Sequence, residues 1–188
     1  MKSFLKRFTA VLAAAALIFT LCSCGKNTEP KKETPENTVS DTNLQKGYES
    51  EKYNLKFTPP EGYVMFTDSQ KAAQMAGSKN TSCEMISEHS DGFPQIKVVF
   101  EKFDGDEAAY LENMKKSFEA NSINASYTDP SETEIAGAKY YGFTISVEDS
   151  INMEVYSKKF GDGILCISVT SLAGSDTGSV LDAFSKMK

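Results

Sequence analysis

An alternation of apolar and polar residues in the second half of the chain constrains the fold more than any other feature of the sequence. It is clearest at Tyr141, Phe143 and Ile145, which are separated by smaller or polar residues. A period of two is typical of a half-buried β-strand. Tight turns at Ala136-Gly137 and Asp149-Ser150 divide the stretch, and such turns join neighbouring antiparallel strands. The sequence therefore predicts an antiparallel meander over residues 133–136, 139–148 and 151–160.

Further strands and a few helices are predicted around this meander. Residues 164–172 are almost continuously apolar, which indicates a central strand covered on both faces. Residues 106–121 carry Leu111, Met114 and Phe118 at helical spacing, so we expect an amphipathic helix that covers the sheet. The fold class is therefore α+β, with helices over a mostly antiparallel sheet of about six to eight strands. The other expected strands are residues 53–58, 63–66, 83–88 and 95–103, and the other expected helices are 69–76, capped by Asp68, and 176–187.

The first residues of the chain have the pattern of a bacterial export signal. Lys2, Lys6 and Arg7 form a positively charged start, and the run from residue 8 to residue 21 contains no charge. A membrane-spanning helix needs about 20 apolar residues, so this run is too short to remain in the bilayer. It fits the apolar region of a signal peptide that is removed from the mature protein.

The segment Leu21-Cys22-Ser23-Cys24 resembles the lipobox of bacterial lipoproteins. The resemblance implies cleavage after Ser23 and a diacylglyceryl group on Cys24, so that residues 1–23 are a lipoprotein signal peptide. The alternative is an ordinary secretory signal in which both cysteines are incidental. With the lipid group, the protein would be held by acyl chains at the extracytoplasmic face of the cell membrane.

The composition divides the mature chain into two parts. Residues 24–47 are dominated by Lys, Glu, Thr, Asn and Pro, and such a segment buries too little apolar surface to offset its ordering entropy. We expect it to be a disordered tether. Residues 48–188 hold all the predicted strands and helices and are expected to form a single globular domain.

The charges and the single histidine exclude several kinds of chemistry. The chain has 20 Lys and Arg against 26 Asp and Glu, a net charge of −6, which disfavours a nucleic-acid partner. His89 is the only histidine, so multi-histidine metal sites are excluded. We expect His89 to be exposed in a polar loop beside Asp91. The segment from Asp104 to Glu107 suggests calcium, but an EF-hand loop starting there would place Lys115 where it needs Glu, so helix capping explains the acids.

Cys83 and Cys166 are the two thiols that would be left after lipidation. Three interpretations stay open: two separate buried thiols, a structural disulfide, or a reactive thiol. The aromatic residues Tyr53, Phe57, Tyr63 and Phe66 are expected to pack in the core or at a sheet edge, and the alternative is a stacking platform for a ligand. No catalytic, cofactor-binding or metal-binding residue is assigned, and no cofactor is expected.

The segment Lys52-Tyr53-Asn54-Leu55-Lys56-Phe57-Thr58-Pro59-Pro60-Glu61-Gly62-Tyr63 is similar to the opening of small bacterial lipoproteins with a PsbP-like fold. The resemblance covers about residues 51–188. It implies an α/β/α sandwich around an antiparallel sheet, a scaffold often used for binding or assembly at membrane surfaces. It supplies no catalytic residue.

These features together predict a membrane-anchored extracytoplasmic lipoprotein with a non-enzymatic binding or assembly domain. Its contacts would be the membrane, through acyl chains on Cys24, and a protein partner or a small ligand. The alternative is an extracytoplasmic hydrolase or thiol enzyme that uses His89 or Cys83.

Overall fold

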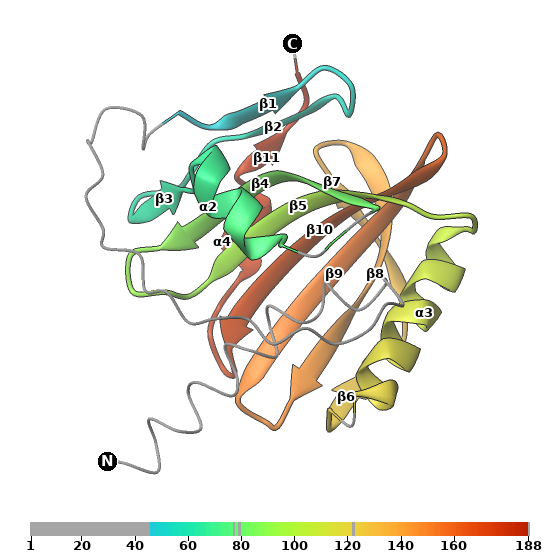
Figure 1. Ribbon diagram of the computed structural model, residues 1–188. Helices are drawn as coiled ribbons and strands as arrows, with labels where there is room; N and C mark the ends of the chain where they lie inside the picture. Colours follow the sequence, from blue (N-terminus) through green and yellow to red (C-terminus); the bar gives the residue numbers. More distant parts are fainter. Residues whose placement is uncertain (1–45, 77, 79, 122, 188) are drawn as a thin grey trace, which may run out of the picture.

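The computed structural model describes residues 46–76, 78, 80–121 and 123–187 (Figure 1). The expected signal peptide, the lipobox from Leu21 to Cys24, and all but the last two residues of the expected tether lie outside the described residues. Among the residues that are described, no helix is both long enough and apolar enough to cross a membrane.

An eight-stranded sheet organises the domain, and all its strand pairs are antiparallel (Figure 1). The strand β10 lies between β5 and β9, and nine of its ten residues are buried. This confirms the predicted meander, the central strand and the mostly antiparallel sheet. The order is β3 (Tyr63–Met65), β4 (Thr81–His89), β5 (Gln95–Lys102), β10 (Gly163–Leu172), β9 (Ile151–Phe160), β8 (Ala138–Val147) and β6 (Ala125–Tyr127), while β7 (Ser131–Ile135) also pairs with β8.

Two helices lie on one face of this sheet. The helix α3 (Glu107–Ala120) packs on β8 and β9 through four buried side chains, which include the predicted Leu111, Met114 and Phe118. The shorter helix α2 (Asp68–Gln74) contacts β4, and Met75 directly after it packs against the same apolar cluster. These contacts form the first of two cores.

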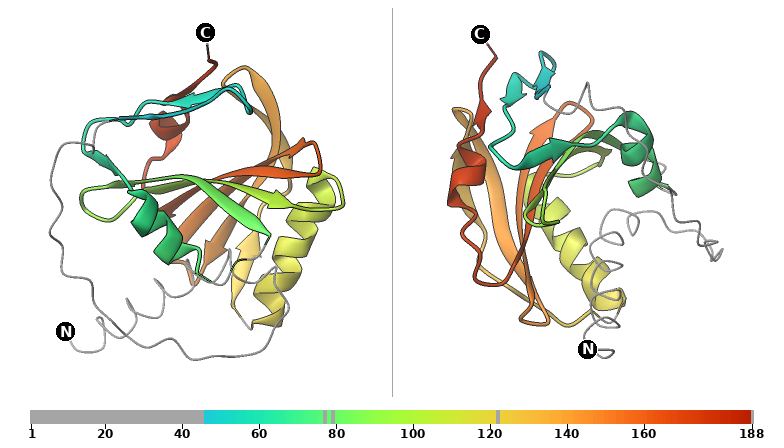
Figure 2. Two further views of the ribbon diagram at one scale, coloured as in Figure 1. Left: turned by 45° about the horizontal axis from the view of Figure 1, so that its top comes forward. Right: turned by 90° about the vertical axis from the view of Figure 1, so that its left-hand side faces the viewer.

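A small sheet covers the opposite face (Figure 2). It consists of β1 (Tyr48–Ser50), β2 (Leu55–Phe57) and β11 (Phe184–Ser185), in that spatial order. The ring of Phe57 lies 4.9 Å from that of Phe184, and both side chains pack against Val98, Leu165 and other residues of the large sheet. The second core therefore joins the first and the last strands of the domain.

The C-terminal segment differs from its prediction. The expected helix over 176–187 is reduced to α4 (Gly178–Leu181), and the chain then forms β11. Gly178 and Ser179 are poor helix formers, whereas β11 gains backbone pairing with β2 and buries Phe184 to 5 % exposure. One outer layer is thus a small sheet with a one-turn helix instead of a long helix.

Helix α2 begins one residue earlier than its predicted cap implied. Thr67, not Asp68, is the N-cap, because its side chain accepts a hydrogen bond from the N–H of Gln70 while the Gln70 side chain accepts from the N–H of Thr67. This is a capping box. Asp68 instead lies in the first turn, where its charge favours the helix dipole.

Candidate functional site

The two predicted thiols lie in one row across the large sheet but do not meet. Cys83 on β4 and Cys166 on β10 are both opposite Val99 on β5, so a whole strand separates them. Two strand spacings amount to about 10 Å, which exceeds the Cα separation of a disulfide, about 4.4–6.8 Å. The disulfide interpretation is therefore wrong, and no disulfide joins these two residues.

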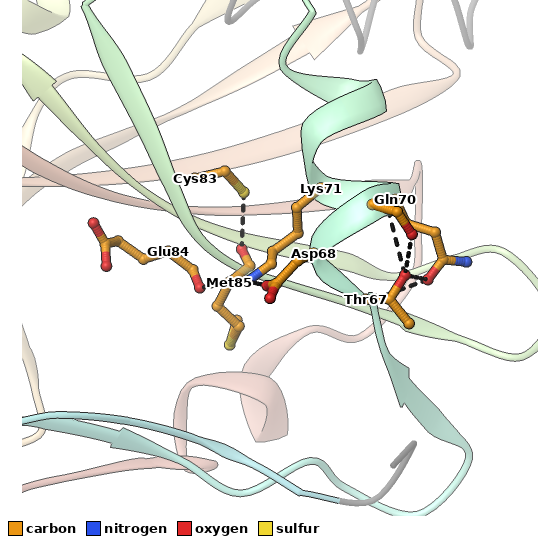
Figure 3. A network of polar contacts seen from close by, with 8 residues as sticks. Thr67, Asp68, Gln70, Lys71, Cys83, Glu84 and Met85 are labelled. Atoms are coloured by element: carbon orange, nitrogen blue, oxygen red, sulfur yellow. Dashed lines mark hydrogen bonds and ion pairs between the residues drawn. The ribbon is translucent and has the colours of Figure 1, made fainter. Parts of the chain in front are cut away.

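The surroundings of Cys83 do not activate its thiol. Its Sγ lies 3.8 Å from the carbonyl oxygen of Met85, and burial raises the pKa of the thiol (Figure 3). The Nζ of Lys71 is engaged elsewhere: it pairs with Asp68 at 2.8 Å and donates to the carbonyl of Glu84 at 3.4 Å. A reactive cysteine needs a lowered pKa, so these contacts describe a structural link between α2 and the bulge of β4.

His89 is the last residue of β4, and its side chain is 30 % exposed, so it is not the open loop residue that was expected. Its Nδ1 accepts a hydrogen bond from the N–H of Asp91 at 3.3 Å, and its ring packs edge-on against Tyr63 at 5.3 Å. It lies six positions along the same strand from Cys83, a distance of about 20 Å. The two residues named for the enzymatic alternative therefore cannot act on one substrate atom.

The acidic segment before α3 is used for structure. Asp106 caps the helix, since its Oδ1 accepts from the N–H of Ala109 at 2.8 Å. The carbonyls of Phe103 and Gly105 accept hydrogen bonds from the Nζ of Lys159, at 2.9 and 2.7 Å. Within the described part of the chain, no group of three or more His, Cys, Asp or Glu side chains could hold a metal ion.

A pocket of about 260 Å³ opens at one end of the second core, between the two sheets. Its wall is built from segments far apart in the sequence: the turn between β1 and β2, the turn between β7 and β8, and the ends of β9 and β11. We call it the cationic pocket, because three lysines line it beside aromatic side chains. The residues that matter below are Lys52, Lys158, Lys186, Tyr53, Tyr140 and Phe160.

The turn residues of the cationic pocket have positive φ. Asn54 has a φ of 51°, and Ala136 and Gly137 have φ values of 53° and 69°. The last two form the predicted two-residue turn, and positive φ at both central positions is the geometry that best fits the twist of a hairpin. This turn brings residues 135–138 against the pocket and holds Lys186 nearby, since a Cβ placed on Gly137 would lie 2.7 Å from its Nζ.

Aromatic rings form the inner wall. Tyr53 and Phe160 meet edge to face with ring centroids 5.1 Å apart, and Tyr140 is 3 % exposed. Burial raises the pKa of Tyr140 to about 12, so its hydroxyl stays neutral at physiological pH. The expectation that Tyr53 packs in the core is confirmed, and the same ring also faces the pocket.

Two of the three lysines of the cationic pocket contact these rings. The Nζ of Lys52 lies 4.7 Å from the ring centroid of Tyr53 and donates a hydrogen bond of 2.8 Å to the hydroxyl of the same residue. The Nζ of Lys158 lies 5.6 Å from the ring centroid of Tyr140. Such cation–π contacts keep an ammonium close to an aromatic wall without neutralising its charge.

A second hollow of about 240 Å³ lies at the start of α3 and has a different character. Its charged groups already have partners: Lys139 pairs with Glu132 at 2.8 Å, and Glu107 accepts a hydrogen bond from the N–H of Lys159 at 2.6 Å. The lining keeps a negative charge, with the carboxylates of Asp106, Glu107 and Glu132 against the ammonium of Lys139, but contacts within the protein already occupy these polar groups. The cationic pocket is therefore the better candidate for a binding site.

None of the three lysines was assigned to a binding site from the sequence. They come from positions spread over most of the domain. Lys52 begins the segment that resembles PsbP-like openings, whereas Lys158 and Lys186 stand in segments without a motif. Their only common signal is the fold itself, which brings two turns and a strand end together. The strands and turns could be predicted, but the junction between the small and the large sheet depends on β11, which was not.

The fold defines an α+β domain with two stacked sheets. Comparisons with known proteins find structures with a similar course of the chain. No protein-family model matches the sequence, and no curated protein matches it. Among solved structures, it is similar to cyanobacterial PsbP (CyanoP) from Synechocystis, with 14 % identity and a TM-score of 0.49, covering 82 % of this chain and all of that one.

Two other solved structures are more distant. One is LpqN, involved in cell envelope biogenesis of Mycobacterium tuberculosis, with 12 % identity, a TM-score of 0.41, and coverage of 71 % of this chain and 83 % of that one. The other is a protein from Bacteroides thetaiotaomicron, with 12 % identity, a TM-score of 0.39, and coverage of 77 % and 49 %. At these identities the likeness concerns the course of the chain, and it assigns no ligand or residue.

Proposed function

We propose that the protein is a lipid-anchored binding protein at the extracytoplasmic face of the cell membrane. The observation that carries the proposal is the segment Leu21-Cys22-Ser23-Cys24, which directly follows a charged start and an uncharged apolar run. In this proposal Cys24 carries the acyl chains and becomes the first residue of the mature protein. Two acyl chains supply the anchoring that a single chain does not.

The charge of the mature protein makes the acyl chains necessary. Removal of residues 1–23 takes away Lys2, Lys6 and Arg7 and no acid, so the net charge falls from −6 to −9. An acidic body is repelled by anionic lipid headgroups. Residues 24–47 would act as a tether with a reach of about 25–30 Å, which lets the domain sample a shell outside the membrane.

Binding fits the described residues better than catalysis does. Cys83 has a raised pKa, and about 20 Å of strand separates it from His89. The cationic pocket, in contrast, combines exposed charge with a preformed apolar wall. We therefore assign the domain a non-enzymatic role, in which it holds a small ligand or a protein partner near the membrane.

Replacement of Cys24 tests the anchor. We expect Cys24→Ala to move the protein from the membrane fraction to the soluble fraction and to remove the mass of the acyl chains. Cys22→Ala is the matched control, because this residue precedes the cleavage site and should leave both anchoring and mass unchanged. Membrane retention of Cys24→Ala, or an unmodified Cys24 in the purified wild-type protein, would contradict the proposal.

A further inference from the structure

We propose that the cationic pocket binds a small organic anion, in which a carboxylate or phosphate group is joined to an apolar body. The inference rests on the proposed binding function and names the class of ligand. It follows from three properties of the pocket, namely its unneutralised charge, its aromatic wall and its size. Each property restricts the ligand independently.

The charge of the pocket is positive and is not cancelled by contacts within the described residues. Lys52, Lys158 and Lys186 line it, and no described carboxylate lies within 4.0 Å of any of their ammonium groups. The described lining residues include no Asp or Glu. Glu84 and Asp162 contribute to the raised pKa of Lys52 only as minor causes, after its hydrogen bond to Tyr53. An anion is the ligand that this arrangement attracts.

Each ammonium keeps donors for a ligand. A lysine has three N–H donors, and Lys52 uses one on the hydroxyl of Tyr53. That hydrogen bond also raises the pKa of Lys52, so its charge is secure at neutral pH. Lys52 and Lys186 are exposed, and Lys158 is half-buried beside Tyr140. A carboxylate or phosphate, with several acceptor oxygens, can bridge such separate donors.

The aromatic wall determines the chemistry of the part of the ligand that is not anionic. Tyr53, Tyr140 and Phe160 present ring surface, and the hydroxyl of Tyr53 is already engaged with Lys52 and with Glu84 at 3.4 Å. The buried Leu55 and Ile135 lie behind them. An apolar or aromatic group gains contact area here, whereas a purely hydrated ion such as free phosphate does not.

The size excludes large partners. Typical ligand pockets measure about 300–1,000 Å³, and this one has about 260 Å³. It lies just below the range that holds drug-sized molecules, so we expect a compact ligand. The site is also a local exception in an acidic chain, so an anion is selected by this pocket and not by the overall charge.

Calorimetric titration of the full chain, purified from cells in detergent, tests the proposal. Two combined probes, phenyl phosphate and benzoate, carry both an anionic group and a ring. Two single-part probes serve as controls: inorganic phosphate carries only the anionic group, and phenol carries only the ring. We expect saturable binding of at least one of the first two, at least about fivefold tighter than either single-part probe. If neither combined probe shows saturable binding, or if phenol binds as tightly as both, the proposal is overturned.

Lysine variants place the binding in the pocket. Lys158→Gln should weaken the bound probe about tenfold, because a lost charge-assisted hydrogen bond is worth about one such factor. The double variant Lys52→Gln with Lys158→Gln should weaken it further. Lys116→Gln, an exposed lysine on α3, removes the same charge elsewhere and should change affinity less than about twofold.

Equal losses in Lys116→Gln and Lys158→Gln would assign the effect to net charge and overturn the proposal. Far-ultraviolet circular dichroism and the urea midpoint of each variant confirm that it is folded. The result of this binding experiment is independent of the test of the lipid anchor. Cys24→Ala should change the cell fraction that contains the protein and leave the pocket intact. A soluble protein that still binds the probe would contradict only the lipid attachment.

Discussion

The hydroxyl of Tyr110 lies 3.1 Å from a carboxylate oxygen of Glu101, and both side chains are buried. Tyr110 belongs to α3 and Glu101 to β5, so this hydrogen bond ties the helix to the large sheet. A buried carboxylate is costly unless it accepts hydrogen bonds. The contact is therefore part of what allows an acid to sit beneath α3.

Removing this hydroxyl should destabilise the fold. For Tyr110→Phe we expect the free energy of unfolding to fall by about 1–3 kcal/mol, because a buried carboxylate loses a donor. Tyr127→Phe is the control, since the Tyr127 hydroxyl makes no hydrogen bond with the described residues, and it should change stability by less than about 0.5 kcal/mol. Urea unfolding measures both, and equal effects would contradict the assigned role of the contact.

The buried Lys97 predicts a pH-dependent stability. It is 5 % exposed, and burial lowers its pKa to about 8 from 10.5. Between pH 8 and pH 10.5 Lys97 is protonated more fully in the unfolded chain than in the folded one, so its contribution to stability rises with pH. Below pH 8 the cost of burying the ammonium is present in full, on the order of 3 kcal/mol.

Lys97→Met should therefore be more stable than the wild type at pH 7, and the difference should shrink between pH 8 and pH 10.5. Lys102→Met, at an exposed position of the same strand, should show no such narrowing. Urea unfolding at a series of pH values measures the differences. A gap between Lys97→Met and wild type that stays constant over this range would refute the burial argument.

The separation of the two thiols predicts their reactivity. Cys166 is completely buried and Cys83 is half-buried with a raised pKa. In the folded protein we expect slow alkylation of Cys83 and none of Cys166, while both react in denaturant. Mild oxidants should produce no Cys83–Cys166 crosslink. Mass spectrometry of peptides after alkylation measures this, and the appearance of that crosslink in folded protein would show that the sheet register is incorrect.

The packing of the C-terminal strand predicts that the stability of the fold depends strongly on Phe184. Phe184→Ala should lower the free energy of unfolding by about 3–5 kcal/mol, since a ring in contact with Phe57 is replaced by a cavity. Ser185→Ala, at the exposed neighbouring position of β11, should have little effect. Thermal unfolding compares them. Similar midpoints for the two variants would mean that β11 does not close the second core.

The regular part of the fold was predictable because local pattern and tertiary packing agree there. The alternation from Tyr141 to Val155 and the apolar run of β10 placed three strands correctly, namely β8, β9 and β10, and Asp106 did cap α3. The segment after Thr177 misled the prediction, since Val180 and Phe184 share a helical spacing yet are buried by different elements. Three-residue strands such as β1 and β6 are too short to show any period.

The three lysines of the cationic pocket could not be predicted from the sequence, because they also depend on how the small sheet packs on the large one. Lys52, Lys158 and Lys186 converge only when the small sheet closes over the large one. Nothing in the neighbouring sequence of a single lysine distinguishes it from a solvated surface charge. The proposed anchor segment from Leu21 to Cys24 is the opposite case, because it was inferred from contiguous residues alone and its prediction needs no knowledge of the fold.

The position of β1 has a mechanical consequence. This three-residue strand pairs only with β2, and the turn that joins them carries Lys52 and Tyr53. Tension applied to the chain before Tyr48 would peel β1 from the sheet edge one hydrogen bond at a time and then pull on that turn. A pull on the amino side of the domain would therefore reach Lys52 and Tyr53 before it reached any strand of the large sheet.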